Sequence, residues 1–168
     1  MIGCRGNHLM QRAIITIKGG NFNLSHVSTV VRDVRNEGTG RVEVMEAISH
    51  GMDTNYLSQI YEASHGLLFW MPMDNTKTQQ KTIMEMAARM IETPTKYDLW
   101  AALTAPFQGF GFVLDIKKFN CSESWWYLQT ACGRLSPVFN KKGQQIAPVP
   151  GDCPAWAQRP IFQLDMQA

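Results

Sequence analysis

The chain has 168 residues, of which 45% are hydrophobic and 18% charged, so it can bury a core and is not disordered by composition. This length fits a single domain that spans residues 1–168. The net charge of +2 is too small to indicate nucleic acid as a partner. The longest apolar stretch, residues 66–73, is less than half of the roughly 20 residues that a membrane helix needs, so we expect no integral membrane segment.

Residues 1–18 carry apolar side chains at a spacing that suits a short amphipathic helix, namely Leu9, Met10, Ala13, Ile14 and Ile17. They contain no apolar run followed by a small-residue cleavage site, so we expect no signal peptide and a cytoplasmic or virus-encoded protein. The four cysteines do not have the spacing of metal ligands, and a chain of this length does not need disulfide bonds. We therefore expect a reducing compartment, no metal and no other cofactor.

Two β-branched runs, residues 27–34 and 42–48, flank the turn-forming segment 36–40, which predicts an antiparallel hairpin. A third strand is predicted over residues 66–71, with a short helix or loop over residues 54–64 before it. On the second run, side chains at alternate positions share a face. This face carries Glu46 among apolar residues, so its carboxylate needs a partner.

The apolar pattern of residues 78–92 predicts a helix that ends before Pro94. Residues 122–132 lack glycine and proline and predict a second helix, which Gly133 ends. The aromatic, glycine-containing segment 100–112 receives no assignment. The proline-rich residues after position 147 predict an extended strap over the surface.

Cys121 stands at the expected N-terminus of the second helix. A helix N-terminus lowers the pKa of a thiol, and its free N–H groups can bind the oxyanion that forms when a thiolate attacks a carbonyl. A free cysteine at this position can equally be a small buried core residue, and position alone does not decide between the two.

His26 opens the first strand of the hairpin, where its ring can point from the sheet edge toward a facing helix. The same ring could bind Glu46, which would then fix its tautomer and orientation. Ser28 is small and would leave room for substrate beside the ring. The chain contains three competing histidines, His8, His50 and His65.

Four short segments in this order resemble successive motifs of the YiiX/YebB-like permuted papain-like hydrolases, within the wider NlpC-like superfamily: Ser25-His26-Val27, Val44-Met45-Glu46-Ala47, Tyr97-Asp98 and Asn120-Cys121-Ser122-Glu123. In that family the histidine strand precedes the cysteine helix, as it does here. The segment from Arg5 to His26 and the segment Pro150-Gly151-Asp152 extend the resemblance over nearly the whole chain.

The resemblance implies an α+β, permuted papain-like fold, with an antiparallel sheet or small barrel packed against helices and the nucleophile at a helix N-terminus. It implies Cys121 as nucleophile, His26 as general base and acid, and Glu46 as the orienting residue. Tyr97 would line the substrate pocket. Ser122 and Ser28 are further candidates for substrate contact.

Two features depart from the family pattern. The chain opens Met1-Ile2-Gly3, without the Gly-Asp pair that usually precedes the first strand. The cysteine helix continues with Trp125, Trp126 and Tyr127 in place of the common aliphatic run, which indicates a wider or flatter acyl site.

The sequence therefore predicts a cysteine hydrolase that cleaves an amide or ester bond, with a peptidoglycan-type peptide as the first guess by superfamily analogy. A lipid acyltransferase or thioesterase like the lecithin:retinol acyltransferase group is one alternative, although Ser122-Glu123-Ser124 replaces the Glu-His expected there. A non-catalytic binding module is a second. A metal site built from His8, His26 and Cys121 is a third, but it lacks the close ligand spacing of zinc sites.

Overall fold

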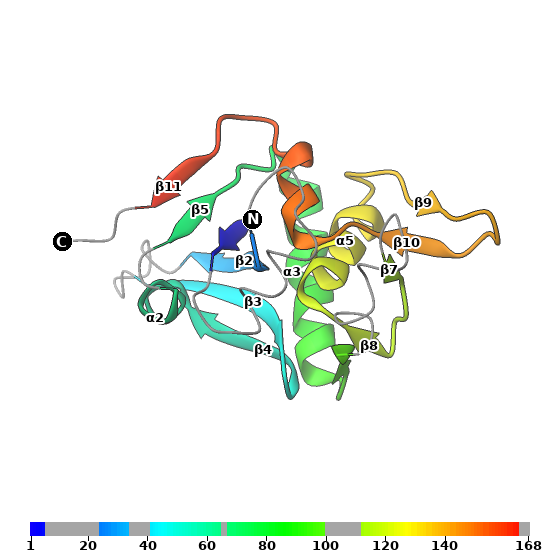
Figure 1. Cartoon of the computed structure of the whole chain (residues 1–168). Helices are drawn as coiled ribbons and strands as arrows, with labels where there is room; N and C mark the ends of the chain where they lie inside the picture. Colours follow the sequence, from blue (N-terminus) through cyan, green and yellow to red (C-terminus); the bar gives the residue numbers. More distant parts are fainter. Residues whose placement is uncertain (6–23, 34–40, 65–66, 100–111, 165–168) are drawn as a thin grey trace.

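A six-stranded antiparallel sheet forms the largest part of the fold, which the computed structural model describes for residues 1–5, 24–33, 41–64, 67–99 and 112–164 (Figure 1). The strand order across the sheet is β11-β5-β1-β2-β3-β4. In chain order these strands are β1 (Ile2–Cys4), β2 (His26–Asp33), β3 (Val42–Ile48), β4 (Gly51–Tyr56), β5 (Leu68–Trp70) and β11 (Phe162–Leu164).

Three α-helices accompany this sheet in the described residues: α2 (Leu57–Ala63), α3 (Lys77–Glu92) and α5 (Cys121–Ala131). A 3₁₀ helix, η3, spans Pro150–Trp156. A small sheet has the order β7-β10-β9, and its strands are β7 (Phe112–Val113), β10 (Gln145–Ala147) and β9 (Val138–Phe139). The strands β6 (Lys96–Tyr97) and β8 (Lys118–Phe119) pair in parallel. The fold is therefore α+β, as the sequence predicts.

The two faces of the sheet bury different apolar sets because side chains alternate along each strand. On β3, Met45 packs with Ile83 of α3 and Leu128 of α5, whereas Val44 packs with Ile60 of α2. Figure 1 shows α3 and α5 beside each other on one side of the sheet and α2 on the other. The helix that begins at Cys121 consequently lies across the strand that begins at His26.

The predicted hairpin, third strand and both helices are confirmed. β2 and β3 pair antiparallel, and β5 lies within the predicted run 66–71. The predicted helix 78–92 corresponds to α3, which Thr76 caps: its Oγ1 accepts from the N–H of Gln79 at 3.2 Å. The turn between β2 and β3 and the unassigned segment 100–111 lie outside the described residues.

Three sequence predictions require correction. Residues 2–4 form β1 rather than part of a helix, because strands β2 and β5 pair with both of its edges, and tertiary pairing overrides a local pattern; the rest of that predicted helix lies outside the described residues. Residues 51–56, predicted partly as helix or loop, form β4. The proline-rich tail is not one extended strap, since it contains η3 and the edge strand β11.

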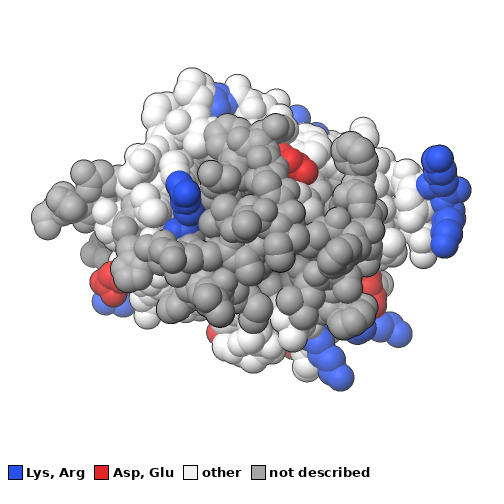
Figure 2. Space-filling view, in the orientation of Figure 1, with Lys and Arg blue, Asp and Glu red and all other residues white. Residues whose placement is uncertain are grey.

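Surface charge and hydropathy give two further observations. On the face shown in Figure 2, the Lys and Arg side chains of the described residues are scattered over separate places and form no broad basic patch. None of the described helices is both long enough and apolar enough to cross a membrane.

Gly51 opens β4 in the hairpin of β3 and β4, and its surroundings leave no room for a side chain. Its φ of 126° disfavours any L side chain, and an added Cβ would clash with the backbone carbonyl oxygen of Thr95. We predict that Gly51→Ala lowers the free energy of unfolding by about 3 kcal/mol or more, measured by urea denaturation. Gly143→Ala is the matched control, because Gly143 also has a positive φ (74°) but open space around it, and we expect a loss of about 1 kcal/mol. Equal losses in the two variants would contradict the role of the Thr95 contact.

Candidate active site

The first turn of α5 is held by a reciprocal cap. The side-chain Oδ1 of Asn120 accepts hydrogen bonds from the N–H groups of Ser122 (3.1 Å) and Glu123 (3.0 Å), and Glu123 Oε2 accepts from the N–H of Asn120 at 2.8 Å. This capping box fixes Cys121 as the first helical residue. The N–H of Cys121 takes no part in this cap, so it is the candidate donor to an oxyanion.

His26, at the start of β2, connects Cys121 to a buried carboxylate. Its Nε2 lies 2.7 Å from Oε2 of Glu46, whose other oxygen accepts from the side-chain amide of Asn55 on β4. An ionised carboxylate can only accept, so Nε2 carries the proton. The other ring nitrogen, Nδ1, is then the one left to interact with Cys121, whose pKa His26 lowers.

The pKa values of the pair shift in opposite directions. Burial raises the pKa of Cys121, but the charge of His26, its hydrogen bond, and the backbone N–H groups of Val27 and Ser122 outweigh burial and hold that pKa below the usual thiol value. Burial lowers the pKa of His26, yet the negative charge and hydrogen bond of Cys121, together with Glu46, raise it well above the usual value for histidine. Between the two values the pair is therefore a thiolate and an imidazolium.

The carboxylate behind the ring is also held ionised. Burial raises the pKa of Glu46, but the hydrogen bond and charge of His26 and the Asn55 hydrogen bond lower it overall. This charge stabilises the imidazolium and orients the ring toward the thiolate. The three side chains thus have the arrangement that nucleophilic catalysis requires.

Two acidic side chains near Cys121 stay neutral. Burial raises the pKa of Glu123 to about 8, and the negative charges of Asp98 and Cys121 act in the same direction. Burial likewise raises the pKa of Tyr97, and Cys121 again contributes. Tyr97 lies on β6 opposite Phe119, two residues before Cys121, so the structure brings this predicted pocket residue close to the thiol.

The two serines predicted to contact substrate are both buried. Ser28, which shares a face of β2 with His26, is 2% exposed. Ser122 is fully buried, and its hydroxyl donates to Asn120 Oδ1 at 3.0 Å, so it forms part of the helix cap. Their contact with substrate stays a prediction.

Cys121 differs from the other three cysteines of the chain. Burial raises the pKa of Cys4, Cys132 and Cys153, and no imidazole hydrogen bond compensates for it. Cys121 is itself buried, in the cluster of Val27 and Trp125, which agrees with the alternative of a core residue. A core role alone, however, does not account for the imidazole beside it.

The competing histidines do not meet Cys121 in the described residues. His50 is exposed and pairs with Asp53 at 3.2 Å, while His8 and His65 lie outside the residues that the structure describes. Of the three residues in the hypothetical metal site, the structure therefore describes only His26 and Cys121. Within the described ranges, no cluster of three or more His, Cys, Asp or Glu side chains is arranged to hold a metal ion.

Sequence analysis missed Asn55 as a member of the site and Asn120 as the helix cap. Asn55 lies on β4, a strand whose polar composition hides its pairing with β3. Asp53 and Asn55 stand two residues apart after Gly51, so on a strand both side chains share a face. This spacing was the signal in the sequence that could have identified Asn55. Asn120 precedes a predicted helix and has Glu123 three residues later, which is the pattern of a capping box.

No protein-family model matches the chain, and no curated protein matches its sequence.

The thiolate–imidazolium pair predicts selective alkylation. We expect iodoacetamide to modify Cys121 at lower pH than Cys132, because the pKa of the first is lowered and that of the second raised. In His26→Ala, burial of Cys121 remains while the positive charge is lost, so its alkylation should begin only at higher pH. Mass spectrometry of the cysteine peptides measures both profiles. His50→Ala, the matched control in the turn between β3 and β4, should leave the Cys121 profile unchanged.

The buried carboxylate predicts a second measurable shift. Replacement of Glu46 by Gln removes the charge that helps to raise the pKa of His26, so the ring should lose its proton at lower pH, by about one pH unit or more. An NMR titration of the His26 ring measures the change. Glu43→Gln is the control, since Glu43 lies on the opposite face of β3 and should not move the titration. An unchanged midpoint in Glu46→Gln would show that the carboxylate does not control the ring.

Proposed function

We propose that this protein is a cysteine hydrolase that cleaves an amide or ester bond through an acyl-enzyme. The observation that carries the proposal is the contact of the Cys121 thiolate, at the N-terminus of α5, with a histidine that is hydrogen-bonded at 2.7 Å to a buried carboxylate. A buried ion pair is costly to maintain for stability alone. Its placement at a helix N-terminus supports a catalytic purpose.

Acylation begins with the attack of the Cys121 thiolate on the substrate carbonyl carbon. A carbon–sulfur bond forms, the carbonyl oxygen becomes an oxyanion, and the Cys121 N–H is the helix donor best placed to bind it. The bond to the leaving amine or alcohol then breaks, and His26 gives its Nδ1 proton to that group. The products of this half-reaction are a free amine or alcohol and a thioester on Cys121.

Deacylation uses the same residues in reverse. Neutral His26 takes a proton from water at Nδ1, and the oxygen of that water attacks the thioester carbonyl. The carbon–sulfur bond breaks, the acid is released, and the thiolate–imidazolium pair is restored. Glu46 keeps the Nε2–H of the ring in place through both half-reactions and stabilises the ring whenever it is charged.

The proposed fold type is the permuted papain-like arrangement. Support comes from the chain order, in which the strand bearing the histidine precedes the helix bearing the cysteine, and from the antiparallel sheet against which α5 packs. All four cysteines are unpaired, which supports action in a reducing, cytoplasmic setting. A peptidoglycan-type peptide is the first substrate class to test, by analogy with the superfamily.

Trapping of the acyl-enzyme tests the proposal. The protein is incubated with three acyl donors, namely a peptidoglycan-type peptide, a p-nitrophenyl ester and a long-chain acyl thioester, then quenched in acid and digested. We expect a mass increase on the Cys121 peptide with at least one donor. Cys121→Ala should lose turnover of that donor, and His26→Ala should lower its kcat by about 10²–10⁴-fold.

The controls separate the alternatives. His50→Ala should keep full activity, because His50 is exposed and pairs with Asp53 away from the thiol. An adduct from the long-chain thioester alone would favour the lipid acyltransferase or thioesterase. Absence of any adduct, or full turnover by Cys121→Ala, would overturn the hydrolase proposal in favour of a non-catalytic binding module.

A further inference from the structure

Strands β7, β8, β9 and β10 lie together at one end of the molecule, and β11 lies at the other (Figure 1). Seven large apolar side chains are exposed in the part of the chain that the structure describes, and four of them belong to the first end: Val113, Ile116, Val138 and Phe139. These four are between 39% and 64% exposed. A concentration of exposed apolar groups on one part of a surface is typical of an interaction site.

Two of these side chains share the outer face of the small sheet. Val113 and Val138 are both paired in register with Ile146 of the central strand β10, so the three side chains point to the same side. The next residue, Gln145, points to the other side, where its side-chain amide donates to Thr130 of α5 at 3.4 Å. The face that carries the two valines is therefore turned away from α5.

Exposed lysines stand beside these apolar side chains: Lys117 and Lys118 at the start of β8, and Lys141 and Lys142 in the turn from β9 to β10. Within residues 112–118 and 138–147 the acidic residue is Asp115, which is half-buried and accepts from the backbone N–H of Lys117 at 3.0 Å. None of the four ammonium groups forms an ion pair with a described residue. We call these four lysines and the four exposed apolar side chains the basic–apolar end.

Lys118 also stands next to a like charge. The strands β6 and β8 pair in parallel with Lys96 opposite Lys118, and both side chains are exposed. Like charges on neighbouring strands repel each other, and Lys96 forms no ion pair with a described residue either. An anionic partner at this position would reduce the repulsion, whereas a neutral or cationic partner would not.

The turn that carries Lys141 and Lys142 is held in place by Asn140. The side-chain Oδ1 of Asn140 accepts from the backbone N–H groups of Lys142 (2.9 Å) and Gln144 (3.0 Å), and its own N–H donates to the carbonyl oxygen of Gln144 at 2.9 Å. Because β7 and β9 both run antiparallel to β10, the chain leaves β7 toward Lys117 at the same end of the small sheet. Both lysine pairs are therefore presented on the same side of the small sheet.

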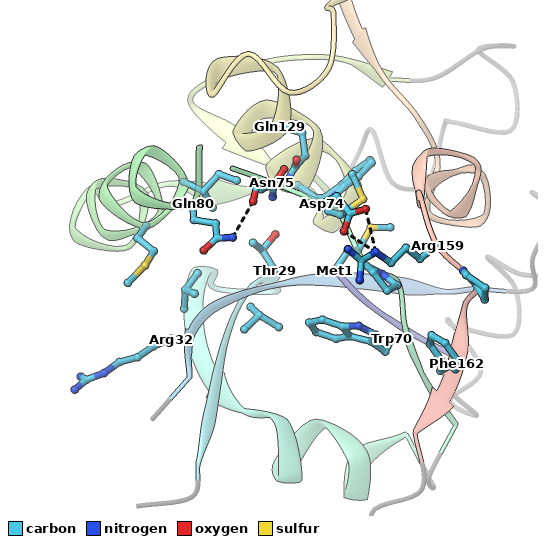
Figure 3. A pocket seen from close by; sticks show the side chains of 18 residues that line it. Met1, Thr29, Arg32, Trp70, Asp74, Asn75, Gln80, Gln129, Arg159 and Phe162 are labelled. Atoms are coloured by element: carbon cyan, nitrogen blue, oxygen red, sulfur yellow. Dashed lines mark hydrogen bonds and ion pairs between the residues drawn. The ribbon is translucent and has the colours of Figure 1, made fainter. Parts of the chain in front are cut away.

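Charged side chains elsewhere in the structure are arranged differently. An open cavity of about 990 Å³ lies between β2, α3, α5 and residues 159–162, and Figure 3 shows Arg159 and Asp74 in its wall directed toward each other. The Nε of Arg159 lies 2.8 Å from Oδ1 of Asp74, and Arg32, the other cationic side chain in the wall, also has an interaction partner. The cations of the cavity are thus engaged within the protein, whereas the lysines of the basic–apolar end are available to a partner.

We infer that the basic–apolar end is a docking surface for an anionic lipid bilayer. The hairpin of β9 and β10 projects from the body of the molecule, and Figure 2 shows cationic side chains at its end. The lysine ammonium groups bind lipid phosphates, and the exposed apolar side chains enter the headgroup region beside them. A bilayer supplies both components, because it offers many anionic groups over a wide area and an apolar layer beneath them. The inference does not depend on the proposed hydrolase activity, because it uses none of the catalytic residues.

Sedimentation with lipid vesicles tests the inference on the full chain with Cys121→Ala, which prevents turnover of lipid esters. We expect binding to vesicles of phosphatidylcholine and phosphatidylglycerol in equal parts, weaker binding at high salt, and little binding to phosphatidylcholine alone. The double variant Lys141→Gln/Lys142→Gln should bind about 25-fold more weakly, at about fivefold for each lysine. The double variant Val138→Ser/Phe139→Ser should lose at least about tenfold.

Matched controls lie on other parts of the surface. Lys77→Gln/Lys81→Gln on α3 removes the same charge, and Phe162→Ser on β11 removes an aromatic side chain that is 53% exposed; both should bind as the parent does. A thermal melt checks folding, and Lys118→Gln should not lower the melting temperature, because it removes the repulsion with Lys96. Failure of the parent to bind the anionic vesicles, equal binding to neutral ones, or equal losses in the controls would overturn the inference. A dimer in light scattering that Val138→Ser/Phe139→Ser abolishes would instead assign the surface to a second copy of the chain.

Discussion

The packing of α5 against β2 is the constraint on which the candidate active site of this protein depends. Cys121, Trp125 and Gln129 are spaced four residues apart, so they follow one stripe of the helix. Along β2, the histidine meets the first of these residues and Thr29 shares a cavity with the other two. One contact between two elements therefore places the histidine beside Cys121 at the start of the helix.

Electrostatics at the first site follow from burial that is opposed by neighbours. Burial alone would keep Cys121 protonated and His26 neutral, and their mutual attraction reverses both tendencies. Glu46 adds a second negative charge behind the ring, so the charges alternate in sign along the three groups. Glu123 and Tyr97 have raised pKa values and stay neutral near pH 7, which keeps further negative charge away from the thiolate.

Local sequence patterns predicted the parts of the fold that depend on local physics. Alternation predicted the hairpin of β2 and β3 and placed Glu46 on a face where it needed a partner, and 3.6-residue periodicity predicted α3 and α5. The same patterns missed β4 and its Asn55, because a polar strand gains its stability from the neighbour with which it pairs. They also assigned residues 2–4 to a helix, although a three-residue segment is defined by the strands on its two sides.

The sequence by itself determined the residue types and their order: a cysteine opening a helix, a histidine opening a strand, and a carboxylate on an apolar strand face. Only the tertiary structure decided that these three meet, that Ser122 belongs to the helix cap, and that Thr29, Asn75, Trp125 and Gln129 surround one cavity. The physical reason is that periodicity specifies which face a side chain occupies, whereas the distance between residues far apart in the chain is set by how whole elements pack.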